Sequence, residues 1–211
     1  MARRTTPPTE PSSSARQRPG RPLGFDQDAA VAALTEAFWE HGWAAASTPV
    51  LEAATGLSRS SLTNTFHTKQ RMLELALGHY NELIANELIT DLDNPRADPA
   101  AALHGFFDTL AHLKTAGPGK HGCLMVNTMI ELPNATGPIR KQTRRYERLL
   151  IDAFTAALDR LQNGPGNETP QRAHALLALA IAINLHARNH DRTALNATIA
   201  AAHDLLAGWG I

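Results

Sequence analysis

The 211-residue sequence is poor in several features that would assign a protein to a class. It holds a single cysteine, which excludes an internal disulfide framework. No apolar run approaches the roughly 20 residues of a membrane helix, and the N-terminus lacks the apolar stretch of a secretory signal. We therefore expect a cytoplasmic protein that has no membrane partner.

Sequence motifs of the common enzyme classes are also missing. The chain has no Gly-x-Ser-x-Gly, no Gly-rich phosphate loop, no His-Glu-x-x-His and no paired carboxylates in a defensible arrangement. We therefore predict no catalytic residues and no cofactor, and an enzyme is the least favoured class.

The charge is balanced overall, with 20 basic and 20 acidic side chains, but its distribution is uneven. Residues 1–24 contain five arginines and one glutamate, which gives +4 there and −4 over the remainder. Residues 1–22 are rich in Pro, Ser, Thr and Arg and have almost no large apolar side chains, a composition typical of disorder. This basic arm either keeps the protein soluble or follows a DNA groove, with Arg21 nearest the folded part.

Residues 47–69, STPVLEAATGLSRSSLTNTFHTK, predict two short helices joined by a tight turn. Ser47 or Thr48 can cap the first helix, and Gly56 can end it, because glycine enters the left-handed conformation without steric cost. Ser58 can then cap the second helix. Two short helices around such a turn are the arrangement of a DNA-reading helix-turn-helix.

The second of these helices is expected to present polar side chains outward while Leu57 and Leu62 face inward. An arginine suits guanine or phosphate, and hydroxyls and an amide suit base edges or phosphate. The outward residues are Arg59, Ser60, Ser61, Thr63 and Asn64. A helical hairpin with a polar outer face is the alternative interpretation of the same pattern.

The rest of the chain predicts only helices, because no sustained alternation of period two is bounded by turns. We expect an all-α fold, with a three-helix helix-turn-helix DNA-binding domain at residues 23–68 and a larger ligand-binding and dimerisation domain at residues 69–211. Besides the pair described above, helices are expected at 26–41, 69–89, 98–115, 123–132, 137–162, 170–188 and 192–208.

The last two expected helices are unusually rich in alanine and leucine. A helix that is apolar over most of its circumference requires burial on more than one side, so these two favour pairing with their copies in a second subunit. An internal core pair in a monomer is the alternative. The residues expected to hold the dimer are Leu176, Ala180, Ile183, Leu185, Leu195, Ile199, Leu205 and Leu206.

The sequences on either side of the helix pair narrow the interpretation. GRPLGFDQDAAVAALTEAFWEHGWAAAS (20–47) leads into it, and KQRMLELALGHY (69–80) follows it. Together these residues resemble the tetracycline-repressor (TetR/AcrR) family of transcriptional regulators. The resemblance implies a repressor that binds a palindromic double-stranded DNA operator as a homodimer and is released by a small-molecule inducer. The family usually has tyrosine where this sequence has Thr63, so the phosphate contact at that position is shortened or lost.

The expected contacts form two groups, one on DNA and one on the inducer. Base or groove contacts are expected from Arg59, Ser60, Ser61 and Asn64, and phosphate contacts from Ser47, Thr48, Thr63, His67, Lys69 and Arg21 of the arm. An apolar pocket in the body is expected to be lined by Tyr80, Ile84, Leu103, Phe107, Cys123, Met125, Met129, Tyr146 and Leu150. The rival from another class is a small-molecule-binding helical dimer without specific DNA binding.

The run from Gly122 to Glu131 also resembles one branch of TetR-like regulators, in which some members sense electrophiles or oxidants through a cysteine. Cys123 would lie at a helix N-terminus, where free N–H groups favour the reactive thiolate. The alternative is an inert, buried thiol. Two metal sites were weaker alternatives, and we predict no metal: a soft copper(I) site from His121, Cys123, Met125 and Met129, and a zinc site from His186 and His190.

Overall fold

The computed structural model describes residues 25–115, 117–162 and 164–211, and within this part of the chain every regular element is helical. Residues 1–24, and with them Arg21 and the basic arm, lie outside the described residues. The all-α prediction is confirmed. The helices are α1 (Gln27–Ala45), α2 (Thr48–Thr55), α3 (Arg59–Phe66), α4 (Lys69–Ile84), α5 (Thr90–Asp93), α6 (Pro99–Thr115), α7 (Leu124–Glu131), α8 (Gly137–Leu161), α9 (Thr169–Arg188) and α10 (Arg192–Gly208).

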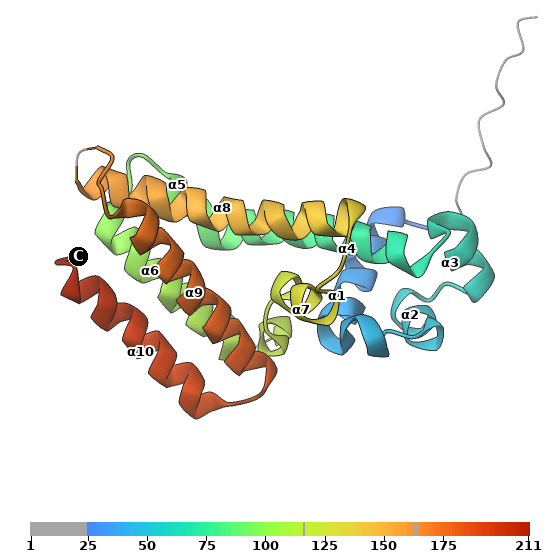
Figure 1. Ribbon diagram of the computed structural model, residues 1–211. Helices are drawn as coiled ribbons and strands as arrows, with labels where there is room; N and C mark the ends of the chain where they lie inside the picture. The colour runs from blue at the N-terminus through green and yellow to red at the C-terminus, as the bar shows by residue number, and fades with distance from the viewer. Residues whose placement is uncertain (1–24, 116, 163) are drawn as a thin grey trace, which may run out of the picture.

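The first helix, α1, and two short ones, α2 and α3, form a head at one end of an elongated molecule (Figure 1). Asp26 caps α1, since its carboxylate accepts the N–H groups of Asp28 and Ala29 at 2.9 and 3.2 Å. The head is not a separate core. Leu34 and Phe38 of α1 are fully buried, and α1 packs along α4 and against α7.

The body consists of the remaining helices. In Figure 1, α4 and α8 run side by side along its length, while α6, α9 and α10 cross beneath one end of them. Its centre holds three phenylalanines: the Phe106 ring meets those of Phe107 and Phe154 edge-on, with centroids 5.2 and 4.9 Å away. A short 3-10 turn, Gly117–His121, connects α6 to α7.

Two helices differ from their expected bounds. The first, expected to end at His41, is interrupted at Gly42, whose φ of 74° is not helical, and one further turn then carries α1 to Ala45. The fourth gives way after Ile84 to a π-helical turn, Ala85–Ile89, before α5 completes the run. No helix in the described ranges is long and apolar enough to cross a membrane.

Candidate DNA interface and effector cavity

The turn between α2 and α3 has the geometry that its sequence predicts. Gly56 adopts the left-handed conformation, φ 68°, and its N–H donates to the carbonyl of Glu52 at 2.9 Å. Ser58 caps α3, because its hydroxyl accepts the N–H of Ser61 at 3.2 Å. Leu62 and Phe66 of α3 are buried in the interior of the head. The opposite face of α3 is therefore free to meet another molecule.

The predicted DNA-contacting residues divide into free and engaged groups. Arg59, Thr63 and Asn64 are exposed on the outer face of α3. The hydroxyls of Ser60 and Ser61 lie 2.9 and 3.0 Å from the hydroxyl of Ser58, so both are hydrogen-bonded to the residue that caps α3. Ser47, Thr48 and His67 are also exposed, and Ser47 precedes α2 without a side-chain capping bond. The hydroxyls of Ser47, Thr48 and Thr63 are therefore accessible to another molecule. Their contacts with DNA, and those of the other residues predicted here, remain a prediction.

Glu52 is a feature of the interface that sequence reasoning missed. Its carboxylate accepts the backbone N–H of Arg59, so it occupies one of the free donors at the start of α3. Arg59 is also the only lysine or arginine between residues 25 and 68. Attraction of the head to phosphate therefore depends heavily on that one side chain.

Lys69 lies at the start of α4 but its ammonium is already engaged inside the molecule. It donates to the carbonyl of Trp43 and lies 4.5 Å from the centroid of the Trp43 ring. Partial burial lowers the pKa of Lys69, and the nearby Glu131 carboxylate opposes that shift. A contact between Lys69 and phosphate would require it to leave these partners.

The same glutamate fixes the junction between head and body. Glu131 of α7 accepts the N–H of Ala44 at 3.0 Å, directly after the bend of α1 at Gly42. A Cβ atom at Gly42 would lie 2.2 Å from the Glu131 carboxylate oxygen. The positive φ favours glycine there, and a larger residue would also displace the flexible carboxylate of Glu131 from its place beside Ala44.

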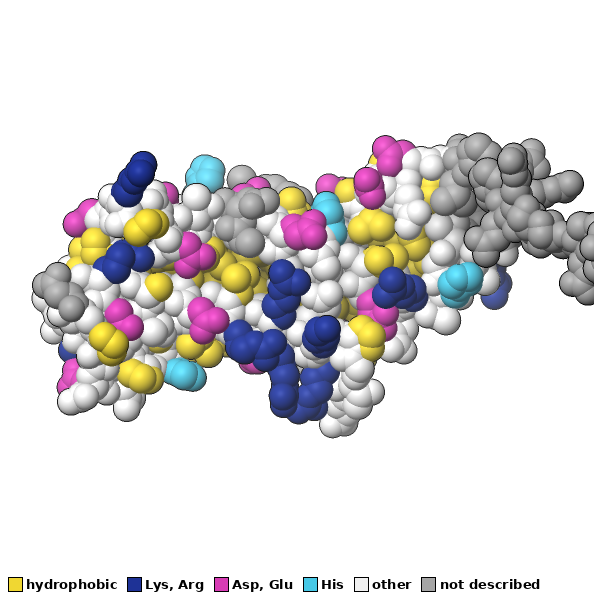
Figure 2. Space-filling model, turned by 90° about the horizontal axis from the view of Figure 1, so that it is seen from above, with side chains coloured by type: hydrophobic (Ala, Val, Ile, Leu, Met, Phe, Trp, Pro, Cys, Tyr) yellow, Lys and Arg dark blue, Asp and Glu magenta, His cyan; other side chains and the backbone are white. Residues whose placement is uncertain are grey.

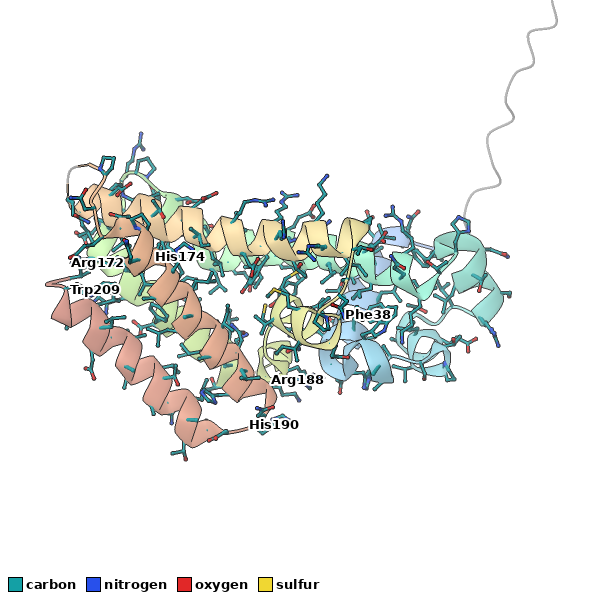
Figure 3. The ribbon with its side chains drawn as sticks, in the orientation of Figure 1. Phe38, Arg172, His174, Arg188, His190 and Trp209 are labelled. Atoms are coloured by element: carbon teal, nitrogen blue, oxygen red, sulfur yellow. The ribbon has the colours of Figure 1, made fainter. Side chains whose placement is uncertain are left out.

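A second connection comes from the C-terminal end of α9, which lies beside α1 (Figure 3). The guanidinium of Arg188, in the last turn of α9, donates to the carbonyls of Trp39 and Glu40 at 3.1 and 2.8 Å (Figure 3). These carbonyls belong to α1, shortly before its bend. Thus α9, a helix expected to bind a second subunit, directly contacts the helix that supports the head.

A cavity of about 370 Å³ lies where α1, α4 and α6 meet, between head and body. Its walls are mainly apolar, with Trp39 and Tyr80 meeting edge-on, their ring centroids 4.9 Å apart, beside Leu83, Ile84 and Leu113. Size and lining are those of a small-molecule site. Because α1 forms one wall, a ligand in this cavity would contact the helix that supports the head.

The structure brings only part of the expected pocket to this cavity, and the remainder of that pocket stays a prediction. Of the predicted residues, only Tyr80 and Ile84 line this cavity, and Met129 lines a separate depression between α7 and α8. The others pack tightly in the core of the body, where the phenylalanine cluster fills the space: Leu103, Phe107, Cys123, Met125, Tyr146 and Leu150. An apolar stripe has the same spacing whether it faces a cavity or a packed neighbour, so periodicity could not separate the two.

Lys114 lines this cavity and also a depression between the end of α6, the end of α9 and the start of α10, and it was not predicted as a site residue. Its ammonium donates to the carbonyl of Gly122 at 2.9 Å, the same oxygen that accepts the indole N–H of Trp39 at 2.9 Å. Burial lowers the pKa of Lys114 to about 8, and the nearby Cys123 opposes that shift. No carboxylate forms an ion pair with it in the described part of the chain.

Cys123 precedes α7 as its capping residue and is 1% exposed. Its thiol neighbours the phenols of Tyr80 and Tyr146, whose pKa values are raised first by burial and then by the charge that Cys123 can carry. Burial restricts access of an oxidant to this thiol, and sensing by Cys123 stays a prediction. Within the described ranges, no group of three or more His, Cys, Asp and Glu side chains could hold a metal ion.

The apolar faces of α9 and α10 also require a correction. Five of the eight residues expected at a dimer interface are buried within the chain itself: Leu176, Ala180, Ile183, Leu195 and Leu206. Leu185 is 38% exposed, while Ile199 and Leu205 are half-buried. One face of each helix thus packs in the core of its own subunit, and only a narrower outer face is left to contact a partner.

Two further polar groups lie outside the α3 surface and the cavity. His104 of α6 and His203 of α10 bring their Nδ1 atoms to 2.7 Å, and His203 also pairs with Asp108 at 3.1 Å. On the surface, the first half of α8 carries an exposed basic face, the dark blue cluster of Figure 2, made of Arg140, Lys141, Arg144, Arg145 and Arg148.

The chain was compared with known proteins. No family model matches it. The HTH-type transcriptional repressor ComR of Escherichia coli K12 is 29% identical over 131 residues, and the match spans 62% of each chain. The TetR-family regulator SCO4454 of Streptomyces coelicolor superposes with a TM-score of 0.73 at 14% identity, over 86% of this chain and 94% of that one.

Two other solved structures give the same result. A TetR regulator from Chloroflexus aurantiacus has a TM-score of 0.71 at 20% identity, over 86% of this chain and 92% of its own. A cysteine mutant of the TetR-family regulator CifR, complexed with 26bp operator DNA, has a TM-score of 0.72 at 22% identity, over 90% and 100%. The resemblance that the sequence carries is thereby confirmed, and this chain has the fold of the TetR-family transcriptional regulators.

Proposed function

We propose that the protein is a ligand-responsive transcriptional regulator, a repressor that binds a palindromic operator as a homodimer. The observation that carries this proposal is the exposed polar face of α3, which projects from the head on the turn formed by Gly56 and Ser58. The name of ComR as a repressor and the operator complex of CifR support the same function.

The proposed DNA contacts are assigned from the exposure and chemistry of the side chains. Arg59 and Asn64 are the best suited to base edges, since a guanidinium can bind guanine with two bonds and an amide can bind adenine likewise. Ser47, Thr48 and Thr63 have hydroxyls suited to phosphate. Two heads related by a dyad would read half-sites about 34 Å apart.

Dimerisation is assigned to the outer face of α9 and α10, around the exposed Leu185. Release of the operator is assigned to a ligand in the cavity between α1, α4 and α6, because that ligand would favour one position of α1 over another. A change in head position then alters the spacing of the two recognition helices. Inducer affinity and operator affinity would be coupled through that movement.

Selection of DNA from a random pool, followed by gel-shift assays at fixed salt, tests the proposal. We expect an enriched sequence with dyad symmetry and half-sites about one helical turn apart. Arg59→Ala should weaken that binding, while Arg96→Ala, at an exposed arginine in the loop before α6, should leave it unchanged. Failure to enrich any sequence would favour the rival function, a ligand-binding helical dimer without an operator.

A further inference from the structure

We propose that the cavity between α1, α4 and α6 takes a small apolar carboxylate, with its acid group paired to the ammonium of Lys114. This inference rests on the proposed ligand-responsive function and names the chemical class of the ligand. It follows from one buried charge, its place in the cavity and the character of the surrounding walls.

The charge of Lys114 forms no ion pair with a carboxylate in the described part of the chain, and the one nearby group that can carry a negative charge is the thiol of Cys123. The residue is 6% exposed, and its only side-chain hydrogen bond is to the Gly122 carbonyl. An ammonium has three donors, so further donors remain for another acceptor. A buried charge is ordinarily paired, and leaving it alone carries a substantial desolvation penalty. A ligand carboxylate would supply the missing partner.

The position of Lys114 is suitable for that role. Its ammonium and the indole N–H of Trp39 converge on one carbonyl oxygen, so the charge is beside the aromatic wall of the cavity. Leu83, Ile84 and Leu113 complete an apolar surface next to it. A molecule with a hydrocarbon or aromatic body and one terminal anion would satisfy both parts of the site.

The other charged groups at the cavity lie towards solvent. Glu36, Glu87 and His112 are exposed, and His79 is half-buried with its Nδ1 3.2 Å from the Thr35 hydroxyl. Water and salt screen the two exposed glutamates, whereas the Lys114 charge is screened far less. We therefore expect the buried cation, and not the acidic rim, to select the ligand.

The test compares three probes that differ only in the end group: 4-phenylbutyrate, 4-phenylbutanol and 4-phenylbutylamine. Binding is measured by calorimetry on the full-length protein without DNA, and by quenching of tryptophan fluorescence. Trp39 lines the cavity and the chain has three tryptophans, so Trp39→Phe should remove the quenching signal. We expect the carboxylate to bind about tenfold more tightly than the alcohol, and the amine to bind most weakly.

Two results tie that preference to Lys114. Lys114→Met should abolish the advantage of the carboxylate over the alcohol, while Lys120→Met, the same change at an exposed lysine nearby, should retain it. At pH 8.5, binding of the carboxylate should also take up protons, because the anion stabilises the charged form of a group whose pKa is about 8. Uptake appears as a calorimetric enthalpy that depends on the buffer, and it should vanish near pH 6.

Equal affinity for the carboxylate and the alcohol would overturn the inference, as would a preference for the amine, since the rim glutamates would then dominate. An unchanged preference in Lys114→Met would also overturn it. Operator release is measured separately by gel shift. If 4-phenylbutyrate binds at Lys114 and operator-bound protein is not released, the ligand class stands and the ligand-responsive function fails.

Discussion

Replacing Lys114 with methionine should make the protein more stable at neutral pH. The side chain is buried with a pKa of about 8, against 10.5 for a free lysine. That difference corresponds to a penalty of about 3 kcal/mol for holding the charge inside the protein. Loss of the bond to the Gly122 carbonyl offsets about 1 kcal/mol. The net expectation is a gain of about 2 kcal/mol in the free energy of unfolding at pH 7.

The gain should disappear as the pH rises. Below pH 8 both folded and unfolded chains hold the proton, so the penalty in wild type is complete. Between about 8 and 10.5 the unfolded chain binds the proton and the folded chain does not, so the stability of wild type rises with pH. Wild type and Lys114→Met should therefore converge near pH 9.5, where about 2 kcal/mol has been recovered.

Urea unfolding followed by circular dichroism, at fixed protein concentration and in carboxylate-free buffer, measures this difference. The raised pKa values of Tyr80 and Tyr146 affect both proteins alike and cancel in the comparison. Lys120→Met, at an exposed position, should follow wild type throughout. Parallel pH curves for wild type and Lys114→Met would refute the assignment of a buried, unpaired charge.

Three further predictions concern the other sites. Arg59→Ala should weaken specific operator binding by about 1–3 kcal/mol without changing the circular dichroism spectrum, and unchanged affinity at fixed salt would remove Arg59 from the base-reading set. Leu185→Glu should convert dimer to folded monomer in analytical ultracentrifugation, whereas Ile130→Glu, at another exposed apolar side chain, should remain dimeric. Mild oxidant should release operator from wild type and not from Cys123→Ser if the thiol is a sensor; identical responses would exclude it.

The helix content and the helix-turn-helix could be predicted from sequence because their signals are local. Gly56 and Ser58 each specify a backbone conformation within a few residues, and the structure has the turn and the cap they predict. The bend at Gly42 was less evident, because glycine indicates a helix end equally well. Glu131, which is distant in sequence, accepts the N–H of Ala44 directly after this bend, and that contact has no local sequence signal.

The candidate cavity could not be predicted for a related reason. Leu103, Phe107 and Tyr80 have the same apolar periodicity, yet two are packed in the core and one borders open space. Lys114 reads in sequence as a basic residue in the last turn of a helix, a favourable surface position. Only the packing of the 3-10 turn, Gly117–His121, against α6 shows that it is buried. The His104–His203 contact likewise depends on α10 lying against α6.

The contact between Arg188 and the carbonyls of α1 has a consequence for how two subunits would respond together. A displacement of α1 by a ligand must either break these two bonds or move the end of α9 with it. If α9 also forms the dimer contact, movement in one subunit changes the surface offered to the other. Occupation of the first cavity would then alter the affinity of the second, and the inducer titration curve of the dimer would depart from a simple hyperbola.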